Sequence, residues 1–210
     1  MSQASLPGGV YGMTAERFSR GRSNIDVVKA MIQGGVRVLQ YREKRPDKQF
    51  RVMLEECRAI RQLTREAGVL FLVDDYPTLA LLAEADGVHV GQDDWPLAEL
   101  RRLVGPDMMI GVSTHEAAEA QAAVAGGADY IGVGPVFATQ TKADAAAPVG
   151  LDYLDYIKKN IPLPFVALGG VKEHNLAQVI AHGARSVCLV TDIVEADDIC
   201  AKVQRLQAMF

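Results

Sequence analysis

Short apolar runs alternate with longer amphipathic segments along the chain, and this alternation restricts the fold more than any other feature. The apolar runs cover residues 10–13, 36–41, 70–73, 87–90, 109–112, 130–133, 165–168 and 186–190. The segments that follow them have helical spacing and cover residues 25–33, 48–67, 77–84, 96–104, 115–125, 151–160, 175–181 and 197–208. Short apolar strands that alternate with helices predict βαβ units and a parallel sheet covered by helices.

Eight such units fit a closed barrel better than an open sheet. In a chain of 210 residues they predict an α/β fold, a (β/α)₈ TIM barrel that forms a single domain over residues 1–210. The main rival is a doubly wound open sheet, but the G-x-G-x-x-G fingerprint expected after its first strand is absent from the sequence. Active residues of such barrels follow the strands. Polar residues directly after the apolar runs are therefore the candidate site.

Charge and composition narrow the classes of partner and the compartment. The net charge of −4 excludes a general nucleic-acid binder, which usually has a basic surplus. We expect no membrane partner, because no apolar run approaches the ~20 residues that span a bilayer. Three cysteines without a CxxC pair, and no signal-peptide pattern in residues 1–10, indicate a cytoplasmic protein. The sequence leaves the oligomeric state open and is compatible with a homo-oligomer.

Cations and carboxylates follow the second, third and fourth apolar runs. Arg42 and Lys44 are two residues apart, so they share one face and together suit a polyphosphate. Asp74 and Asp75 follow the third run, and Asp94 follows the fourth. Carboxylates at neighbouring strand ends form the hard oxygen site that Mg²⁺ shares with substrate phosphates. Taken singly, each group is equally typical of a charged loop, a turn or a helix cap.

Hydroxyl groups and one further cation follow the fifth and sixth runs. Ser113 is a candidate ligand contact, whereas His89 lies within a predicted strand and is interpreted as structural. Thr139, Thr141 and Lys142 supply donors without acceptor charge, which suit a pyrophosphate. Their loop is compatible with a lid over the barrel mouth and with a plain polar surface loop.

The last two loops predict a second anion site. Gly170 follows the seventh run, and Val190 with Thr191 stands at the end of the eighth. Barrels often bind a phosphate at these two loops through backbone N–H groups, and glycine permits close backbone approach. The residues thus predict one cationic, metal-assisted site and one backbone phosphate site. Two anionic substrates, one with a pyrophosphate leaving group, explain both.

Five motifs, in order, carry a family resemblance. They are Gln-Tyr-Arg-Glu-Lys at 40–44, Gly-Val-His-Val-Gly-Gln-Asp-Asp at 87–94, Gly-Val-Ser-Thr-His at 111–115, Gly-Val-Gly-Pro-Val-Phe-Ala-Thr-Gln-Thr-Lys at 132–142 and Ala-Leu-Gly-Gly at 167–170. Over nearly its whole length the chain resembles the thiamine phosphate synthase (thiamine-phosphate pyrophosphorylase) family. The resemblance implies that hydroxymethylpyrimidine pyrophosphate condenses with hydroxyethylthiazole phosphate, giving thiamine monophosphate and pyrophosphate. It also implies that Mg²⁺ assists departure of pyrophosphate from a pyrimidine methylene cation, which the thiazole nitrogen captures.

The resemblance also implies roles for individual residues. It gives Asp75 and Asp94 as Mg²⁺ ligands, and Arg42, Lys44, Ser113 and Lys142 as catalytic residues. The substrate-binding residues it implies are Gln40, Asp74, Thr139, Thr141, Gly170, Val190 and Thr191. The chain departs from the family at Asp74, where Asn is usual, and at Tyr41, where a smaller aliphatic residue is usual.

Two other functions stay open at this point. A thiazole tautomerase-like isomerase shares the barrel, but the intact loop 139–142 and the paired acids favour the synthase. A non-catalytic binder of phosphate ligands is the third hypothesis, and Asp74 is its sequence support. A carboxylate repels a diphosphate unless it is protonated or bound to a metal, whereas an amide donates to it.

Overall fold

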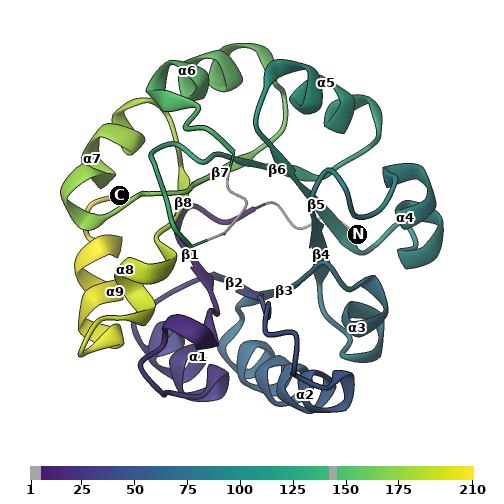
Figure 1. Cartoon of the computed structure of the whole chain (residues 1–210), viewed down its shortest axis with the longest axis vertical. Helices are drawn as coiled ribbons and strands as arrows, with labels where there is room; N and C mark the ends of the chain where they lie inside the picture. The colour runs from purple at the N-terminus through teal and green to yellow at the C-terminus, as the bar shows by residue number, and fades with distance from the viewer. Residues whose placement is uncertain (1–5, 142–145) are drawn as a thin grey trace.

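The computed structural model describes residues 6–141 and 146–210, and its strands form a closed parallel barrel in which neighbours in sequence are neighbours in space. Helices surround this ring of strands (Figure 1). The strands are β1 (Gly9–Met13), β2 (Val38–Tyr41), β3 (Leu70–Asp74), β4 (Gly87–Val90), β5 (Met109–Thr114), β6 (Tyr130–Val133), β7 (Phe165–Leu168) and β8 (Ser186–Cys188). The predicted (β/α)₈ barrel is confirmed.

The helices follow the predicted order. They are α1 (Asn24–Gln33), α2 (Phe50–Ala67), α3 (Pro77–Leu82), α4 (Leu97–Val104), α5 (Ala117–Ala125), α6 (Gly150–Asn160), α7 (Glu173–Ala181), α8 (Val190–Val194) and α9 (Ile199–Gln207), with a 3₁₀ turn at Glu16–Phe18. Within the described residues, no helix combines the length and the apolar character that a membrane crossing requires.

The predicted boundaries were wrong by one or two residues at the first, second, third, fifth and eighth strands. β5 continues to Thr114, so Ser113 lies within this strand rather than after it. Asp74 is the last residue of β3 rather than part of the loop, and it pairs in register with His89 of β4. Val190 was expected to end the eighth strand, but β8 stops at Cys188, which pairs with Leu168. No ladder partner is recorded beyond that pair in the described chain, so the backbone turns at Leu189 and α8 begins at Val190.

Alternation along the strands divides the buried side chains into two cores. One cluster fills the barrel interior and includes Tyr11, Leu72, Met109 and Tyr130. The other cluster lies between the strands and the helices and includes Phe71. Because successive side chains of a strand point to opposite faces, the residue two places after each interior residue also points inward.

Polar residues occupy the next inward layer, toward the carboxyl ends of the strands. Gln40 lies two residues after Val38, and Asp74 lies two after Leu72. Gln40 and Asp74 are both buried. The barrel interior is therefore apolar and aromatic toward the amino ends of the strands and polar toward their carboxyl ends. This places the candidate site at the carboxyl ends.

A buried ionic cluster fixes the loop after β2. Lys48 contacts Glu16 and lies 2.9 Å from Glu43 and 2.7 Å from Glu56, and only 5% of its side chain is exposed. Glu43 also accepts the backbone N–H of Arg45 at 2.9 Å. Since Glu43 lies between Arg42 and Lys44 in sequence, the cluster anchors the segment that carries both cations.

The loop after β6 is anchored against β7. Val136 N–H donates to the carbonyl of Leu168 at 2.9 Å, and Phe137 N–H donates to that of Gly169 at 3.0 Å. Gly170 has φ of +66°, and a Cβ at this position would overlap the backbone oxygens of Phe137 and Ala138. Glycine is thus required where these two loops meet, because both its conformation and its lack of a side chain are used.

Replacing Lys48 by Met tests the anchoring cluster. The variant leaves buried carboxylates without their cation, so the free energy of unfolding at neutral pH should fall by about 3–5 kcal/mol. Burial is the largest single influence on Glu43 and acts to raise its pKa, but the hydrogen bond and charge of Lys48 together with the N–H of Arg45 outweigh burial, so the pKa is lowered. This stabilisation is present above the ordinary carboxyl pKa and is lost as pH falls through the folded-state value.

Denaturant unfolding at neutral and acid pH measures the effect, with exposed Lys29→Met as the matched control. The difference between the parent protein and Lys48→Met should narrow below about pH 4. A loss no larger than that of Lys29→Met, or one independent of pH, would contradict this role for the cluster.

Candidate active site

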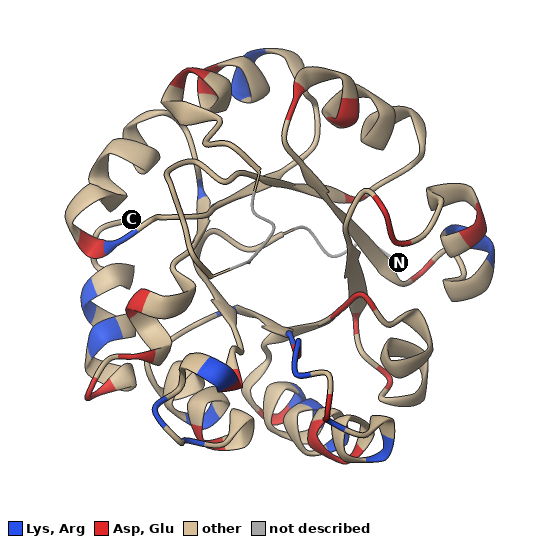
Figure 2. Cartoon of the chain, in the orientation of Figure 1, with Lys and Arg blue, Asp and Glu red and all other residues tan. Residues whose placement is uncertain are grey.

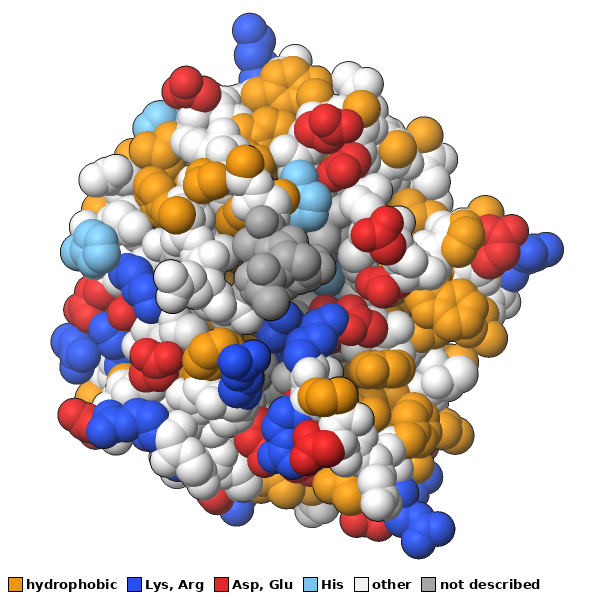
Figure 3. Space-filling model, in the orientation of Figure 1, with side chains coloured by type: hydrophobic (Ala, Val, Ile, Leu, Met, Phe, Trp, Pro, Cys, Tyr) orange, Lys and Arg blue, Asp and Glu red, His pale blue; other side chains and the backbone are white. Residues whose placement is uncertain are grey.

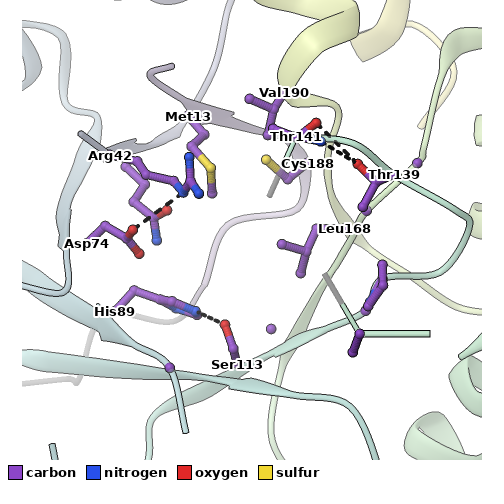
Figure 4. A pocket seen from close by; sticks show the side chains of 18 of the residues that line it. Met13, Arg42, Asp74, His89, Ser113, Thr139, Thr141, Leu168, Cys188 and Val190 are labelled. Atoms are coloured by element: carbon purple, nitrogen blue, oxygen red, sulfur yellow. Dashed lines mark hydrogen bonds and ion pairs between the residues drawn. The ribbon is translucent and has the colours of Figure 1, made fainter. Parts of the chain in front are cut away.

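A cavity of about 980 Å³ opens at the carboxyl ends of the strands, and residues from all eight strands or their loops line it (Figure 4). Twelve of the thirteen residues predicted from the sequence are among those that line it. They are Gln40, Arg42, Lys44, Asp74, Asp75, Asp94, Ser113, Thr139, Thr141, Gly170, Val190 and Thr191. Lys142, the thirteenth, lies outside the described residues.

Two cations and two carboxylates form an ionic group at the ends of β2 and β3. Arg42 Nε and Lys44 Nζ each lie 3.5 Å from Asp74 Oδ2, and Lys44 also contacts Asp75. Figure 2 shows basic and acidic positions close together in this region, and Figure 3 shows such side chains near the centre of the face in view. Both cations already point toward the same carboxylate oxygen, and two convergent cations are an arrangement that suits a polyanion.

The environment of Asp74 changes its protonation. Burial raises the pKa of Asp74 to about 7, and the neighbouring charge of Asp75 adds to this, while Lys44 and Arg42 act in the opposite direction. For Lys44, burial acts to lower the pKa, but the attraction of Asp74 and Asp75 is stronger, so the pKa is raised. Near neutral pH the group therefore holds a charged lysine beside an aspartic acid that is partly protonated.

Asp75 and Asp94 are the carboxylates predicted from the sequence for a metal site, and both line the cavity. Asp75 has φ of +63°, a conformation that Asp tolerates better than most residues, and its N–H donates to the carbonyl of His89 at 2.8 Å. Asp94 Oδ2 accepts the N–H of Gly91 at 2.6 Å. Two carboxylates in one cavity fit Mg²⁺, which usually takes one or two protein carboxylates and completes its shell with water and substrate phosphates.

Glu16, Glu43 and Glu56 are a different acidic group. Their ligand atoms lie within 4.8 Å of one another, the arrangement that a metal ion needs. The ammonium of Lys48 contacts all three carboxylates, so a cation of the protein already occupies the centre of the group. The triad acts as an anchor for the loop after β2 in this structure.

His89 was interpreted as structural, and the structure gives it a more exact position. Both ring nitrogens have partners: Nε2 lies 2.9 Å from Ser113 Oγ, and Nδ1 lies 2.8 Å from the hydroxyl of Tyr130. Burial lowers the pKa of His89 to about 4, so the ring is neutral at physiological pH. His89 lines the cavity as well.

The opposite side of the cavity carries hydroxyls and a third cation. Thr139 Oγ1 accepts the N–H of Thr141 at 3.2 Å, and the two hydroxyls lie 3.2 Å apart. Lys172 Nζ donates to Thr191 Oγ1 at 2.6 Å and also lines the cavity. The sequence analysis did not single out Lys172, although it lies only two residues after Gly170.

The fold and the cavity define the class of protein: a TIM-barrel enzyme with carboxylates and cations gathered at the carboxyl ends of its strands. Comparison with known proteins makes this specific. The model of the thiamine monophosphate synthase family matches residues 10–193. The chain belongs to this family, and its function is that of a thiamine-phosphate synthase, a transferase of thiamine biosynthesis.

Individual relatives agree. A thiamine-phosphate synthase of Pelotomaculum thermopropionicum is 58% identical over 204 residues, which cover 97% of this chain and 93% of the relative. One of Lawsonia intracellularis is 46% identical over 204 residues, with the same coverage of 97% and 93%. The solved structure of a thiamine phosphate pyrophosphorylase from Pyrococcus furiosus superposes with a TM-score of 0.88 at 32% identity, covering 96% of this chain and 94% of that one.

Asp74→Asn tests the burial of the carboxyl group. The folded pKa of about 7 lies above the value near 3.9 of an unfolded Asp, so between these values folding takes up a proton. Stability of the parent protein is therefore reduced as pH rises through this window. The variant cannot titrate at this position. As pH rises from about 4 to about 8, its free energy of unfolding should therefore increase by about 2–4 kcal/mol relative to that of the parent.

Denaturant unfolding across this pH range measures the gain, and the exposed Asp107→Asn is the matched control. Stability curves of Asp74→Asn and the parent that stay parallel over the whole range would exclude a raised pKa at Asp74.

Proposed function

We propose that the chain joins an aminopyrimidine methyl diphosphate to a thiazole phosphate, using Mg²⁺, and that the residues of this cavity carry the reaction. The observation that supports this most strongly is the separation of donors within one cavity. Arg42 and Lys44 lie with carboxylates at one side, and the hydroxyls of Thr139 and Thr141 lie in the loop joined to β7. Two anionic substrates need two such donor groups.

The diphosphate is bound by the cationic side. Arg42, Lys44 and Lys142 hold its oxygens, and Asp75 with Asp94 would hold Mg²⁺. When bound, Mg²⁺ supplies Lewis-acid stabilisation of charge on the departing diphosphate. The contacts of Arg42 and Lys44 with Asp74 keep both cations directed at this part of the cavity before the ligand binds.

Asp74 takes the role that an amide has elsewhere in the family. In its protonated form the carboxyl group has one O–H, which donates to a diphosphate oxygen as an Asn N–H does. The pKa of about 7, caused chiefly by burial, supports this because the protonated form is then populated near neutral pH. Gln40 and Ser113 orient the pyrimidine ring and its diphosphate.

The thiazole phosphate is bound on the opposite side. Thr139 and Thr141 contact the thiazole substrate, while Gly170 and the backbone at Val190 and Thr191 hold its phosphate. The absence of a side chain at Gly170 supports close approach of an anion to the backbone.

The proposed reaction is a dissociative displacement. The bond between the pyrimidine methylene carbon and the diphosphate oxygen breaks, and its electron pair leaves with the diphosphate. The lone pair of the thiazole nitrogen then forms the new C–N bond, which gives thiamine monophosphate. No proton has to be removed from the attacking nitrogen, so charge stabilisation by Arg42, Lys44 and Lys142 matters more than a general base.

The decisive experiment mixes the purified protein with both substrates and Mg²⁺ and follows products by mass spectrometry. Thiamine monophosphate together with pyrophosphate is the expected result. Isomerised thiazole without release of pyrophosphate would favour the tautomerase-like alternative. Tight binding of thiamine phosphate without turnover at saturating Mg²⁺ would favour a non-catalytic binder.

Two broader expectations belong to the same proposal. Residues 1–210 act as one domain, and the protein works in the cytoplasm on small molecules. Free Cys57, Cys188 and Cys200, none in a disulfide, support a reducing compartment.

Asp94→Ala tests the metal assignment. Loss of one of two carboxylate ligands should lower kcat/KM by about 100-fold at limiting Mg²⁺, with partial recovery as the Mg²⁺ concentration is raised. Because Asp94 is exposed, thermal unfolding should change little. Asp107→Ala is the control, since exposed Asp107 precedes β5 at the opposite end of the strands. Turnover equal to that of the control at every Mg²⁺ concentration would reject the assignment.

A further inference from the structure

A continuous chain of hydrogen bonds crosses the barrel interior beneath the cavity. Gln40 Nε2 donates to the hydroxyl of Tyr11 at 3.1 Å, and this hydroxyl lies 3.0 Å from that of Tyr130. The Tyr130 hydroxyl lies 2.8 Å from His89 Nδ1, and His89 Nε2 lies 2.9 Å from Ser113 Oγ. The chain thus joins the two residues, Gln40 and Ser113, that are proposed to orient the pyrimidine; Figure 4 shows its His89–Ser113 end.

The chain of hydrogen bonds is buried, and an acceptor at one of its ends has no partner. Tyr11, Tyr130 and Gln40 are almost completely inaccessible. Buried polar atoms are normally paired, yet Gln40 Oε1 has no partner among the described residues. Gln40 lines the cavity, so an N–H donor of a bound molecule that reaches this buried oxygen would give it the partner it lacks.

Counting protons gives the chain a direction. A tyrosine hydroxyl donates one hydrogen, so Tyr11, which accepts from Gln40, donates to Tyr130. Tyr130 then donates to His89 Nδ1, which leaves the imidazole proton on Nε2 and directs it to Ser113 Oγ. If His89 donated from Nδ1 instead, the proton of Tyr11 would lack an acceptor within the described residues.

Two glycines make room for this chain. A Cβ at Gly111 would overlap the ring of Tyr130, and a Cβ at Gly132 would lie 3.2 Å from Cε1 of His89. At these two positions β5 and β6 therefore lack a side chain, which leaves space for the rings of Tyr130 and His89. The rings are held by space as well as by hydrogen bonds, which favours one fixed arrangement.

We propose that Tyr11, Tyr130 and His89 are positioning residues that hold His89 as its Nε2–H tautomer, so that Gln40 presents an acceptor and Ser113 a donor to the substrate. The identity of that substrate rests on the proposed function. An amino group on the pyrimidine needs an acceptor, which Gln40 Oε1 supplies. A diphosphate oxygen needs a donor, which the free O–H of Ser113 supplies. If every hydrogen bond of the chain ran in the reverse direction, Gln40 would present its N–H group to the amino group of the pyrimidine. Ser113 would then present a lone pair, rather than its O–H, to the anionic diphosphate.

The tautomer is measured directly in the parent protein. Long-range ¹H–¹⁵N NMR spectra distinguish the two neutral forms of histidine, and the His89 signals are assigned by their absence from His89→Gln. We expect the Nε2–H form. The Nδ1–H form, or a mixture of the two, would overturn the proposal. This measurement uses no substrate, so it decides the inference even if the proposed function fails.

Tyr130→Phe measures the consequence for the reaction. Loss of one donor in a buried chain should lower kcat/KM for the pyrimidine diphosphate by about tenfold, mostly through KM, and leave KM for the thiazole phosphate within about twofold. His89 should then sample both tautomers. Tyr11→Phe, which removes the preceding hydroxyl, is the second variant if Tyr130→Phe does not fold.

Tyr156→Phe is the matched control, because Tyr156 is half-buried on α6 and its hydroxyl accepts a hydrogen bond from Gln121. It should change neither KM nor the tautomer. The proposal would be rejected if Tyr130→Phe lowered kcat/KM equally for both substrates and left the His89 tautomer unchanged, because Tyr130 would then have a merely structural role. A parent protein without synthase activity would instead reject the proposed function.

Discussion

Closure of eight parallel strands into one barrel is the constraint on which the rest of the structure depends. Closure directs every second side chain of each strand into a space with no exit except the two ends. Large side chains such as Tyr11, Leu72 and Tyr130 fill the lower part of this space. The next inward residue on a strand therefore reaches the mouth, and polar residues there, such as Gln40, line the cavity in which a ligand can bind.

Closure of the barrel also explains why the charged groups at its mouth interact strongly. Asp74 belongs to a strand and so stays in a poorly hydrated environment, where charges interact far more strongly than in water. Arg42 and Lys44 come from a loop that the Lys48 cluster fixes from outside the barrel. The site is thus supported from two sides: the interior of the barrel positions the carboxyl group, and the anchored loop brings the cations to it.

The sequence predicted the barrel because the alternation of runs is strong, and it predicted the residues of the mouth because active residues follow strands in this fold. It did not predict which strand residues point inward, since Gly87–Val90 is apolar around His89 and gives no sign of the partners Tyr130 and Ser113. Nor did it find Lys172, whose contact with Thr191, 19 residues further on, joins the segments that follow β7 and β8. Such contacts depend on the register of strands across the barrel.

The family resemblance implies Asn at position 74, and the surroundings described above make the Asp found there chemically similar to it. Burial, and after it the charge of the neighbouring Asp75, raises the pKa of Asp74 to about 7. Its protonated form has the size of an amide and donates a hydrogen bond as an amide does. The barrel therefore makes an acidic residue chemically close to the neutral residue it replaces, but only while pH stays near or below that pKa. At higher pH the same position would repel the diphosphate that Arg42 and Lys44 attract.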